Sequence, residues 1–153
     1  MQDPIQLAQR GFGLVESLVA LVVISVGMIG IAVLYGQGLR ASVTALDRTR
    51  AVNLASDMAD RIRANRRGEG GYNTASAADR DCDPGDNKDC TSAEMANHDV
   101  WRWRTQVGNT LPGPGTGTIA YAAGAPPTYT ITVNWQEANG AAQYVLTLQL
   151  PNR

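Results

Sequence analysis

Glu16 is the residue whose type and position most demand a chemical explanation, because it stands at the head of a long apolar run. From Ser17 to Leu39 the only ionisable side chain is that of Tyr35. A helix of that length is roughly 34 Å long, enough to cross the roughly 30 Å hydrocarbon core of a bilayer. An ionised carboxylate in such a helix costs about 3 kcal/mol near the bilayer centre and less near its edge. We therefore expect Glu16 to have a cationic partner.

Two cysteines, Cys82 and Cys90, form the second candidate for chemistry. Beside an export-type N-terminus, such a pair indicates a disulfide that closes a short loop. The loop-entropy relation gives about 2.5 kcal/mol of stabilisation for so small a ring. Zinc binding by the pair is disfavoured, because the spacing is not C-x2-C and the chain has no second pair.

The segment 68–90 is rich in Gly, Asp and Asn and is predicted to be a surface loop. Its acids are Asp79, Asp81, Asp83, Asp86 and Asp89. Their spacing resembles the start of a calcium loop, which keeps calcium open as an alternative. However, Pro84 stands where an EF-hand needs Gly, and Cys90 stands where it needs a bidentate Glu. Turn-capping by Asp and Asn explains the composition more simply, so we expect no metal.

The sequence gives no indication of a catalytic site. His98 is the one histidine, and its position next to Asp99 suggests an exposed surface residue rather than a ligand or base. A single histidine without a paired nucleophile, a metal cluster or a phosphate-binding loop defines no active site. We expect no enzyme, no cofactor and no small-molecule substrate.

Three interpretations of residues 1–39 follow from pattern alone. A secretory signal peptide has an apolar region of about 7–15 residues and a small-residue cleavage site. The present run is longer, and residues 36–40 make a poor site. A plain single-span anchor leaves Glu16 unexplained. In the third interpretation, which we favour, a short leader is removed on the cytoplasmic side of the apolar run, and the run stays in the mature chain.

Residues 11–21, Gly-Phe-Gly-Leu-Val-Glu-Ser-Leu-Val-Ala-Leu, resemble the class III signal of type IV pilins and pseudopilins. The resemblance implies that a prepilin peptidase cleaves between Gly11 and Phe12 and that the new amine of Phe12 is methylated. It also implies that Glu16 pairs with the N-terminal amine of a neighbouring subunit. Such a pair would set the axial register of subunits, because a buried charge left unpaired is penalised. A Glu16 that merely faces lipid headgroups is the alternative.

The helix is predicted to continue to about Asn65, because apolar residues recur at helical spacing after the apolar run. This stripe consists of Leu39, Val43, Leu46, Leu54, Met58 and Ile62. Asp57 and Arg61 form a favourable i,i+4 pair, and glycines at 68, 70 and 71 end the helix. The amphipathic half needs a domain to pack on.

Residues 53–66, Asn-Leu-Ala-Ser-Asp-Met-Ala-Asp-Arg-Ile-Arg-Ala-Asn-Arg, resemble a stretch of the minor pilins called PilV, or type IV pilus modification protein. The arginines Arg61, Arg63, Arg66 and Arg67 are either a solvated helix end or a surface for docking another minor pilin. No aromatic residues interleave with them, so we do not expect nucleic-acid binding.

The rest of the chain predicts a second helix and a β-meander. Thr91-Ser92-Ala93-Glu94 is a capping box before a helix over 92–109. The apolar residues of that helix and its end are Ala93, Ala96, Val100, Trp103, Val107 and Leu111. Strands are predicted over 116–122, over 128–135 and over 144–150, with a hairpin turn at Asn139-Gly140 between the last two.

These patterns predict an α+β, type IV pilin-like fold, in which a long N-terminal helix packs on a small antiparallel β-meander, with an extra short helix and a disulfide loop. We divide the chain into a cleaved leader (1–11), a transmembrane and polymerisation helix half (12–38) and a periplasmic head domain (39–153). The head contains the amphipathic helix half (39–66), a loop (67–91), a helix (92–109) and an antiparallel sheet (116–150).

By resemblance, the chain is a minor pilin that helps prime assembly of the type IV pilus and is incorporated at or near the pilus tip. Its implied partners are other minor pilins, the major pilin and a tip adhesin-like protein, with prepilin peptidase as processing enzyme. Its implied location is the bacterial inner membrane, as a single-pass protein with a periplasmic head, and then the pilus. A minor pseudopilin of a type II secretion system is the runner-up. A membrane-tethered module that binds a ligand or DNA is the alternative of another class.

Overall fold

A computed structural model describes residues 13–83, 85 and 88–151. The predicted leader (1–11) and Phe12 lie outside the described residues. The chain divides into two compact units, Met1–Ser42 and Val43–Arg153. Helix α1, Leu14–Ala64, begins in the first unit and ends in the second.

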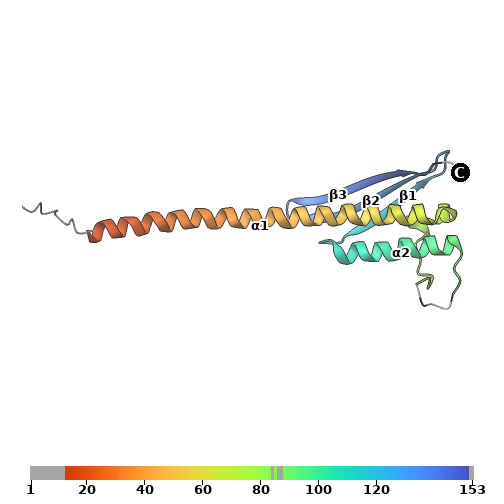
Figure 1. The fold of residues 1–153 in the computed structure, drawn as a ribbon, viewed down its shortest axis with the longest axis horizontal. Coiled ribbons are helices and arrows are strands. Elements are labelled where there is room, and N and C mark those ends of the chain that lie inside the picture. Colours follow the sequence, from red (N-terminus) through yellow and green to blue (C-terminus); the bar gives the residue numbers. More distant parts are fainter. Residues whose placement is uncertain (1–12, 84, 86–87, 152–153) are drawn as a thin grey trace, which may run out of the picture. The chain divides into compact units, whose positions relative to one another are not determined.

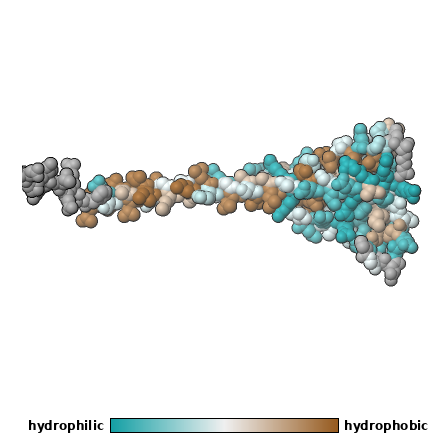
Figure 2. Space-filling model, in the orientation of Figure 1, coloured by the Kyte–Doolittle hydropathy of each residue, from teal (hydrophilic) through white to brown (hydrophobic). Residues whose placement is uncertain are grey.

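The first unit consists of the apolar part of α1. Every described side chain up to residue 42 is exposed, including large apolar ones such as Leu18, Ile24 and Ile31. Figure 2 shows brown, apolar side chains along this part of the chain. By length and composition, α1 is able to cross a membrane. Nothing described in this chain buries this apolar surface, so another environment must do so.

The second unit contains the sheet and the remaining helical elements (Figure 1). After α1 come two short 3-10 helices, η1 (Arg66–Gly71) and η2 (Thr74–Ser76), and then α2 (Ser92–Thr110). The strands are β1 (Thr116–Ala122), β2 (Thr128–Glu137) and β3 (Gly140–Gln149). They form an antiparallel sheet in the order β1-β2-β3. A long helix on a small antiparallel sheet with a disulfide is consistent with the type IV pilin fold, as predicted.

The core lies on one face of the sheet, because side chains alternate along each strand. Tyr129, Ile131, Val133 and Trp135 of β2 are buried, and the residues between them are more exposed. They cluster with residues of α1 and α2. The buried residues of α1 are Asp47, Ala51, Leu54, Ala55, Met58, Ala59 and Ile62.

We expected the whole apolar stripe of α1 to pack on the head, and this expectation is wrong for the first half of the stripe. Leu39, Val43 and Leu46 are 68%, 59% and 49% exposed, and burial begins at Asp47. Helical spacing identifies a face of a helix but does not say how far along that face a partner extends.

The local predictions after α1 need smaller corrections. The segment 67–91 is not wholly irregular, because η1 and η2 fall within or overlap it. The hairpin turn lies one residue earlier than predicted, since Glu137 pairs with Gly140 and leaves Ala138 and Asn139 at the turn. The pairing of β3 with β2 extends back to Gly140, so β3 begins there rather than at Tyr144.

Helix α2 starts as predicted at a capping box, with Thr91 and Glu94 each bonding the backbone of the other. The Thr91 N–H and, as a smaller effect, the Thr91 hydroxyl donate to the Glu94 carboxylate at 3.0 Å and 2.9 Å, and they hold its pKa below the usual value. All the predicted apolar positions of α2 and its end are buried except Ala93, which is exposed.

Trp103 joins α2 to both neighbouring elements. Its indole N–H donates to the backbone oxygen of Leu54 in α1 at 2.8 Å, and its side chain is fully buried. On the β1 side, Gly117 lies against the indole ring. A Cβ at Gly117 would lie 2.5 Å and 2.6 Å from two ring carbons, closer than atoms pack in proteins. Glycine at 117 therefore permits the close approach of β1 to α2.

We predict that Gly117→Ala lowers the free energy of unfolding of the full chain in detergent by about 1–3 kcal/mol, because the ring and strand must move apart. Urea denaturation followed by tryptophan fluorescence measures this change. Gly108→Ala is the matched control, because its Cβ would lie 3.6 Å from the nearest atom, an ordinary contact in a helix. It should be neutral or stabilising by up to about 1 kcal/mol. Equal effects of the two substitutions would contradict the close-packing explanation.

Candidate assembly site

Glu16 lies in the first turn of α1, where a carboxylate interacts favourably with the helix dipole. Its surroundings are apolar and exposed: Leu14 is 91% exposed, Val15 77% and Val19 55%. Among the described residues, no cation pairs with its carboxylate. Gly11 and Phe12, the predicted cleavage and methylation residues, lie outside the described residues. The arrangement leaves a carboxylate on an apolar helix surface that is open to a partner.

The four predicted docking arginines do not form one surface. Arg61 points into the second unit, where its guanidinium contacts Asp57 at 3.0 Å and Asp99 of α2 at 3.1 Å. Burial acts to lower the pKa of Arg61, but the two carboxylates outweigh it and the net shift is upward. Arg61 thus links α1 to α2 within the chain.

Tyr72 completes this link. Its hydroxyl donates to Asp99 Oδ2 at 2.8 Å and also lies 3.2 Å from the backbone oxygen of Arg61. Burial, with a further contribution from the Asp99 carboxylate, raises the pKa of Tyr72. The tyrosine therefore stays neutral and acts as a hydrogen-bond donor between α2 and the end of α1.

The other arginines differ in their surroundings. Arg63 is exposed and pairs with Asp60 at 2.6 Å. Arg66 is half-buried and donates to the backbone oxygen of Pro151, after β3. Its Nε is buried without a hydrogen-bond partner among the described residues. Arg67 is exposed. Arg63 and Arg67 are the members of the group whose charge faces solvent.

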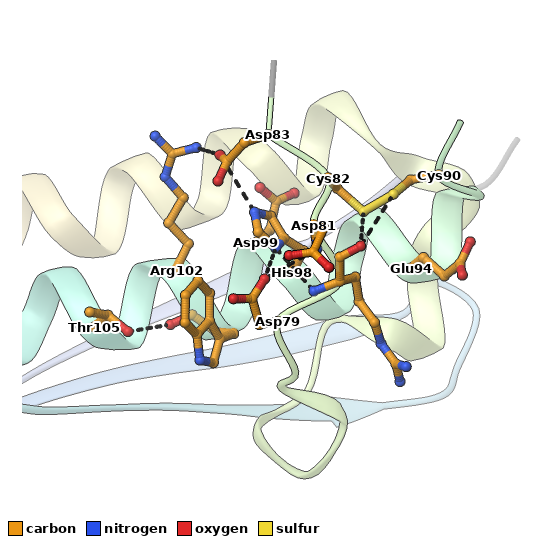
Figure 3. A network of polar contacts seen from close by, with 12 residues as sticks. Asp79, Asp81, Cys82, Asp83, Cys90, Glu94, His98, Asp99, Arg102 and Thr105 are labelled. Atoms are coloured by element: carbon orange, nitrogen blue, oxygen red, sulfur yellow. Dashed lines mark hydrogen bonds and ion pairs between the residues drawn. A yellow bond between two sulfur atoms is a disulfide. The ribbon is translucent and has the colours of Figure 1, made fainter. Parts of the chain in front are cut away.

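Cys82 and Cys90 form a disulfide, as predicted (Figure 3). The segment before Cys82 lies along α2: the N–H of Ala78 donates to the oxygen of Asn97 at 3.2 Å. The N–H of Arg80 donates to Nδ1 of His98 at 3.3 Å. The disulfide loop is thus held against the first turns of α2.

His98 was predicted to be exposed, and this is wrong, because only 2% of its surface is accessible. The loop covers it. Asp79 Oδ1 lies 3.2 Å from Nδ1, and Asp83 Oδ1 lies 3.5 Å from Nε2 (Figure 3). Arg102 also pairs with Asp83. His98 lies outside the Ala96–Val100–Trp103 stripe, so helical spacing places it on another face; the loop that buries that face is distant in sequence.

Two of the acids of the loop, Asp79 and Asp83, are used in these contacts. Asp79 and Asp83 face His98 and Arg102, and Lys88 donates to the backbone oxygen of Arg80 at 2.8 Å. In the described part of the chain, no group of three or more His, Cys, Asp or Glu side chains is arranged to hold a metal ion. The loop is organised by hydrogen bonds and ion pairs with α2.

A further ion pair, which the sequence pattern did not reveal, joins α1 to the end of β2. Arg48 donates through Nε and Nη2 to the two carboxylate oxygens of Glu137, at 2.8 Å and 2.9 Å. The indole N–H of Trp135 donates to the same carboxylate at 3.3 Å. The hydrogen bonds from Arg48, opposed in part by desolvation, hold the pKa of Glu137 below its usual value.

Comparisons with known families match two adjoining parts of the chain, the N-terminal apolar segment and the segment that runs from α1 into α2. A sequence model described as the prokaryotic N-terminal methylation motif matches residues 7–32, which include Glu16. A model described as Tt1218-like, type IV pilin Tt1218, matches residues 34–101, from the middle of α1 into α2. No curated protein and no solved structure matches the chain.

The first match indicates the class of protein, a prokaryotic protein with an N-terminal methylation motif. Together with the second match it supports a type IV pilin. The pilin family is structural rather than enzymatic. It implies assembly with other pilins and processing by a prepilin peptidase, and the apolar helix fits membrane anchoring and incorporation into a pilus.

We predict that Glu137→Gln destabilises the full chain at pH 7, because it removes the ionised partner of Arg48. A carboxylate whose pKa is lowered on folding stabilises above its ordinary pKa, 4.5, and this contribution is lost as pH falls through the lowered folded value. The difference in thermal midpoint between wild type and variant should therefore shrink as pH falls below about 4.

Asp89→Asn is the control, because Asp89 is exposed and has no ion-pair partner among the described residues. It removes the same charge and should leave the midpoint at pH 7 nearly unchanged. A Glu137→Gln effect that is equal at pH 7 and at pH 3 would show that packing, rather than the ion pair, is responsible.

Proposed function

We propose that this protein is a minor pilin, similar to the PilV family, that helps prime assembly of the type IV pilus and is incorporated at or near its tip. The observation that carries the proposal is the exposed apolar part of α1 with Glu16 at its head. A helix of this kind needs lipid first and sister helices afterwards. The stretch 53–66, which resembles PilV, supports the choice of a minor pilin.

In this proposal, cleavage between Gly11 and Phe12 creates the amine with which assembly begins. The positive amine of Phe12 in one subunit pairs with Glu16 in its neighbour. The apolar surroundings of Glu16 make the pairing selective, because either charge alone in such surroundings is penalised. The apolar helix supplies the area of contact, and the charge pair sets the axial offset.

In this proposal, the head determines which other proteins the subunit binds. The proposed partners are other minor pilins, the major pilin and a tip adhesin-like protein. Arg63 at the end of α1 and Arg67 in η1 are the exposed arginines of this group that such partners can contact, whereas Arg61 serves the internal link to α2. The proposed location is the inner membrane with a periplasmic head, followed by the pilus.

Processing is tested by intact mass measurement and N-terminal sequencing of the protein from native membranes. We expect a chain that starts at Phe12 and carries one methyl group on its amine. A strain without prepilin peptidase should retain the Met1 start. A wild-type chain that still starts at Met1, or that starts after residue 36, would contradict the prepilin interpretation.

The role in assembly is tested by deleting the gene and restoring it with variants. We expect deletion to reduce surface pili and twitching, and Glu16→Ala to fail to restore them although the protein is processed normally. Leaving an amine unpaired costs about 3 kcal/mol or more, which corresponds to roughly a 100-fold loss in assembly.

Ser17→Ala, at the neighbouring position, is the control and should restore piliation. Normal piliation and twitching in the deletion strain, with loss of protein secretion, would favour a type II secretion pseudopilin instead. Full complementation by Glu16→Ala would contradict the proposed charge pair.

A further inference from the structure

Strand β3 leaves one side of its backbone open. The N–H of Gln136 donates to Pro112, away from β3, and the N–H of Leu150 donates to Pro127, toward β2. Backbone groups point to alternate sides along a strand. In β3, even-numbered residues therefore bond to β2, and odd-numbered residues direct N–H and C=O to the edge. The outward residues are Ala141, Gln143, Val145, Thr147 and Gln149.

Among the residues that the structure describes, none bonds to these outward backbone groups. The opposite edge of the sheet is different. There, Thr74 of η2 covers β1: its hydroxyl accepts from the N–H of Ile119 at 2.6 Å and donates to the oxygen of Ile119 at 3.1 Å. The β1 edge is thus capped by the chain itself at Ile119, whereas no described residue caps the β3 edge.

The side chains of β3 do not protect this edge. Exposed edge strands in natural proteins commonly carry charges, prolines or bulges that prevent pairing with another chain. From Gly140 to Leu150 there is no charged residue and no proline, and the pairing register with β2 is unbroken. Val145 is 47% exposed. The strand has the features of a site for strand addition rather than of a protected edge.

On the face of the sheet that packs against the core, β3 leaves apolar surface that an added strand would cover. Tyr144 and Leu146 pack against the core but are only partly buried, in contrast to Tyr129 and Ile131 in the central strand. An added strand with apolar side chains on this face would cover Tyr144 and Leu146 and extend the core. The spacing of open N–H and C=O groups fits an extended strand, and the absence of charge fits an uncharged one.

We propose that the free edge of β3 binds an extended, uncharged strand of a different pilin, rather than of a second copy of this chain, and that this strand becomes the fourth in the sheet. This inference rests on the proposed function for the identity of the partner. It adds a docking surface in the head, separate from Glu16 and from the arginines. Backbone hydrogen bonds supply the affinity, and the apolar side chains beside Tyr144 and Leu146 supply the selectivity.

Photo-crosslinking in native membranes tests the proposal with the full-length protein. A photoreactive phenylalanine analogue replaces Val145 on β3. The control replaces Thr118 on β1, which lies in the same row of the sheet at the opposite edge (Thr118, Thr132 and Val145 are in register). We expect adducts from Val145, identified by mass spectrometry as containing another pilin, at about ten times the yield from Thr118.

Gln143→Pro tests whether the backbone is responsible. It removes an N–H that faces the edge and leaves the hydrogen bonds to β2 in place, as prolines in edge strands do. Loss of one or two hydrogen bonds should lower the adduct yield about tenfold. Unchanged far-ultraviolet circular dichroism and an intact Cys82–Cys90 disulfide would show that the fold is retained.

The remaining outcomes contradict either the docking inference or the proposed function. Absence of an adduct, equal yields from the two positions, an adduct only with a second copy of this chain, or no effect of Gln143→Pro would each overturn the docking inference. If piliation nevertheless depends on the gene, the proposed function stands without the docking inference. An adduct with another pilin in a strain that is fully piliated without the gene would retain the docking inference and overturn the proposed function.

Discussion

One face of α1 between Asp47 and Ile62 packs against both the sheet and α2, and this double contact determines the arrangement of the head. Ala51, Ala55 and Ala59 are fully buried and lie four residues apart on that face. Small side chains let neighbouring elements come close to the helix backbone. Trp103 uses this closeness to reach the backbone oxygen of Leu54. Gly117 then allows β1 to pack against the opposite side of the same ring.

Polar contacts specify how α2 sits against α1. Arg61 is held between Asp57 and Asp99, and Tyr72 donates to the same Asp99. In partly buried surroundings a charged side chain must have partners, because leaving it unpaired is costly. This network and the hydrogen bond from Trp103 to Leu54 together specify the position of α2 along α1. The disulfide loop adds a second set of contacts through His98.

In the function proposed for this chain, assembly and folding use different parts of it. The residues that carry the fold, such as Trp103 and Arg61, are buried or paired within the second unit. The features that the two proposals assign to partners are a carboxylate on an exposed apolar helix, exposed arginines and an open strand edge. A chain that folds a core in its second unit and exposes surfaces of these kinds is suited to joining an assembly, since each surface gains free energy when a partner covers it.

The sequence by itself determined the features that depend on neighbouring residues. The helical periods, the capping box of α2, the alternation in β2, the Cys82–Cys90 pair and the position of Glu16 in the apolar run are all local patterns. Only the tertiary structure decided that burial of α1 begins at Asp47, that Arg61 points inward and that His98 is covered. It also decided that Thr74 caps the outer edge of β1 at Ile119 and that the outer edge of β3 is open. The reason is physical: burial and pairing depend on what lies opposite a residue in space, and that partner belongs to a segment far away in the chain.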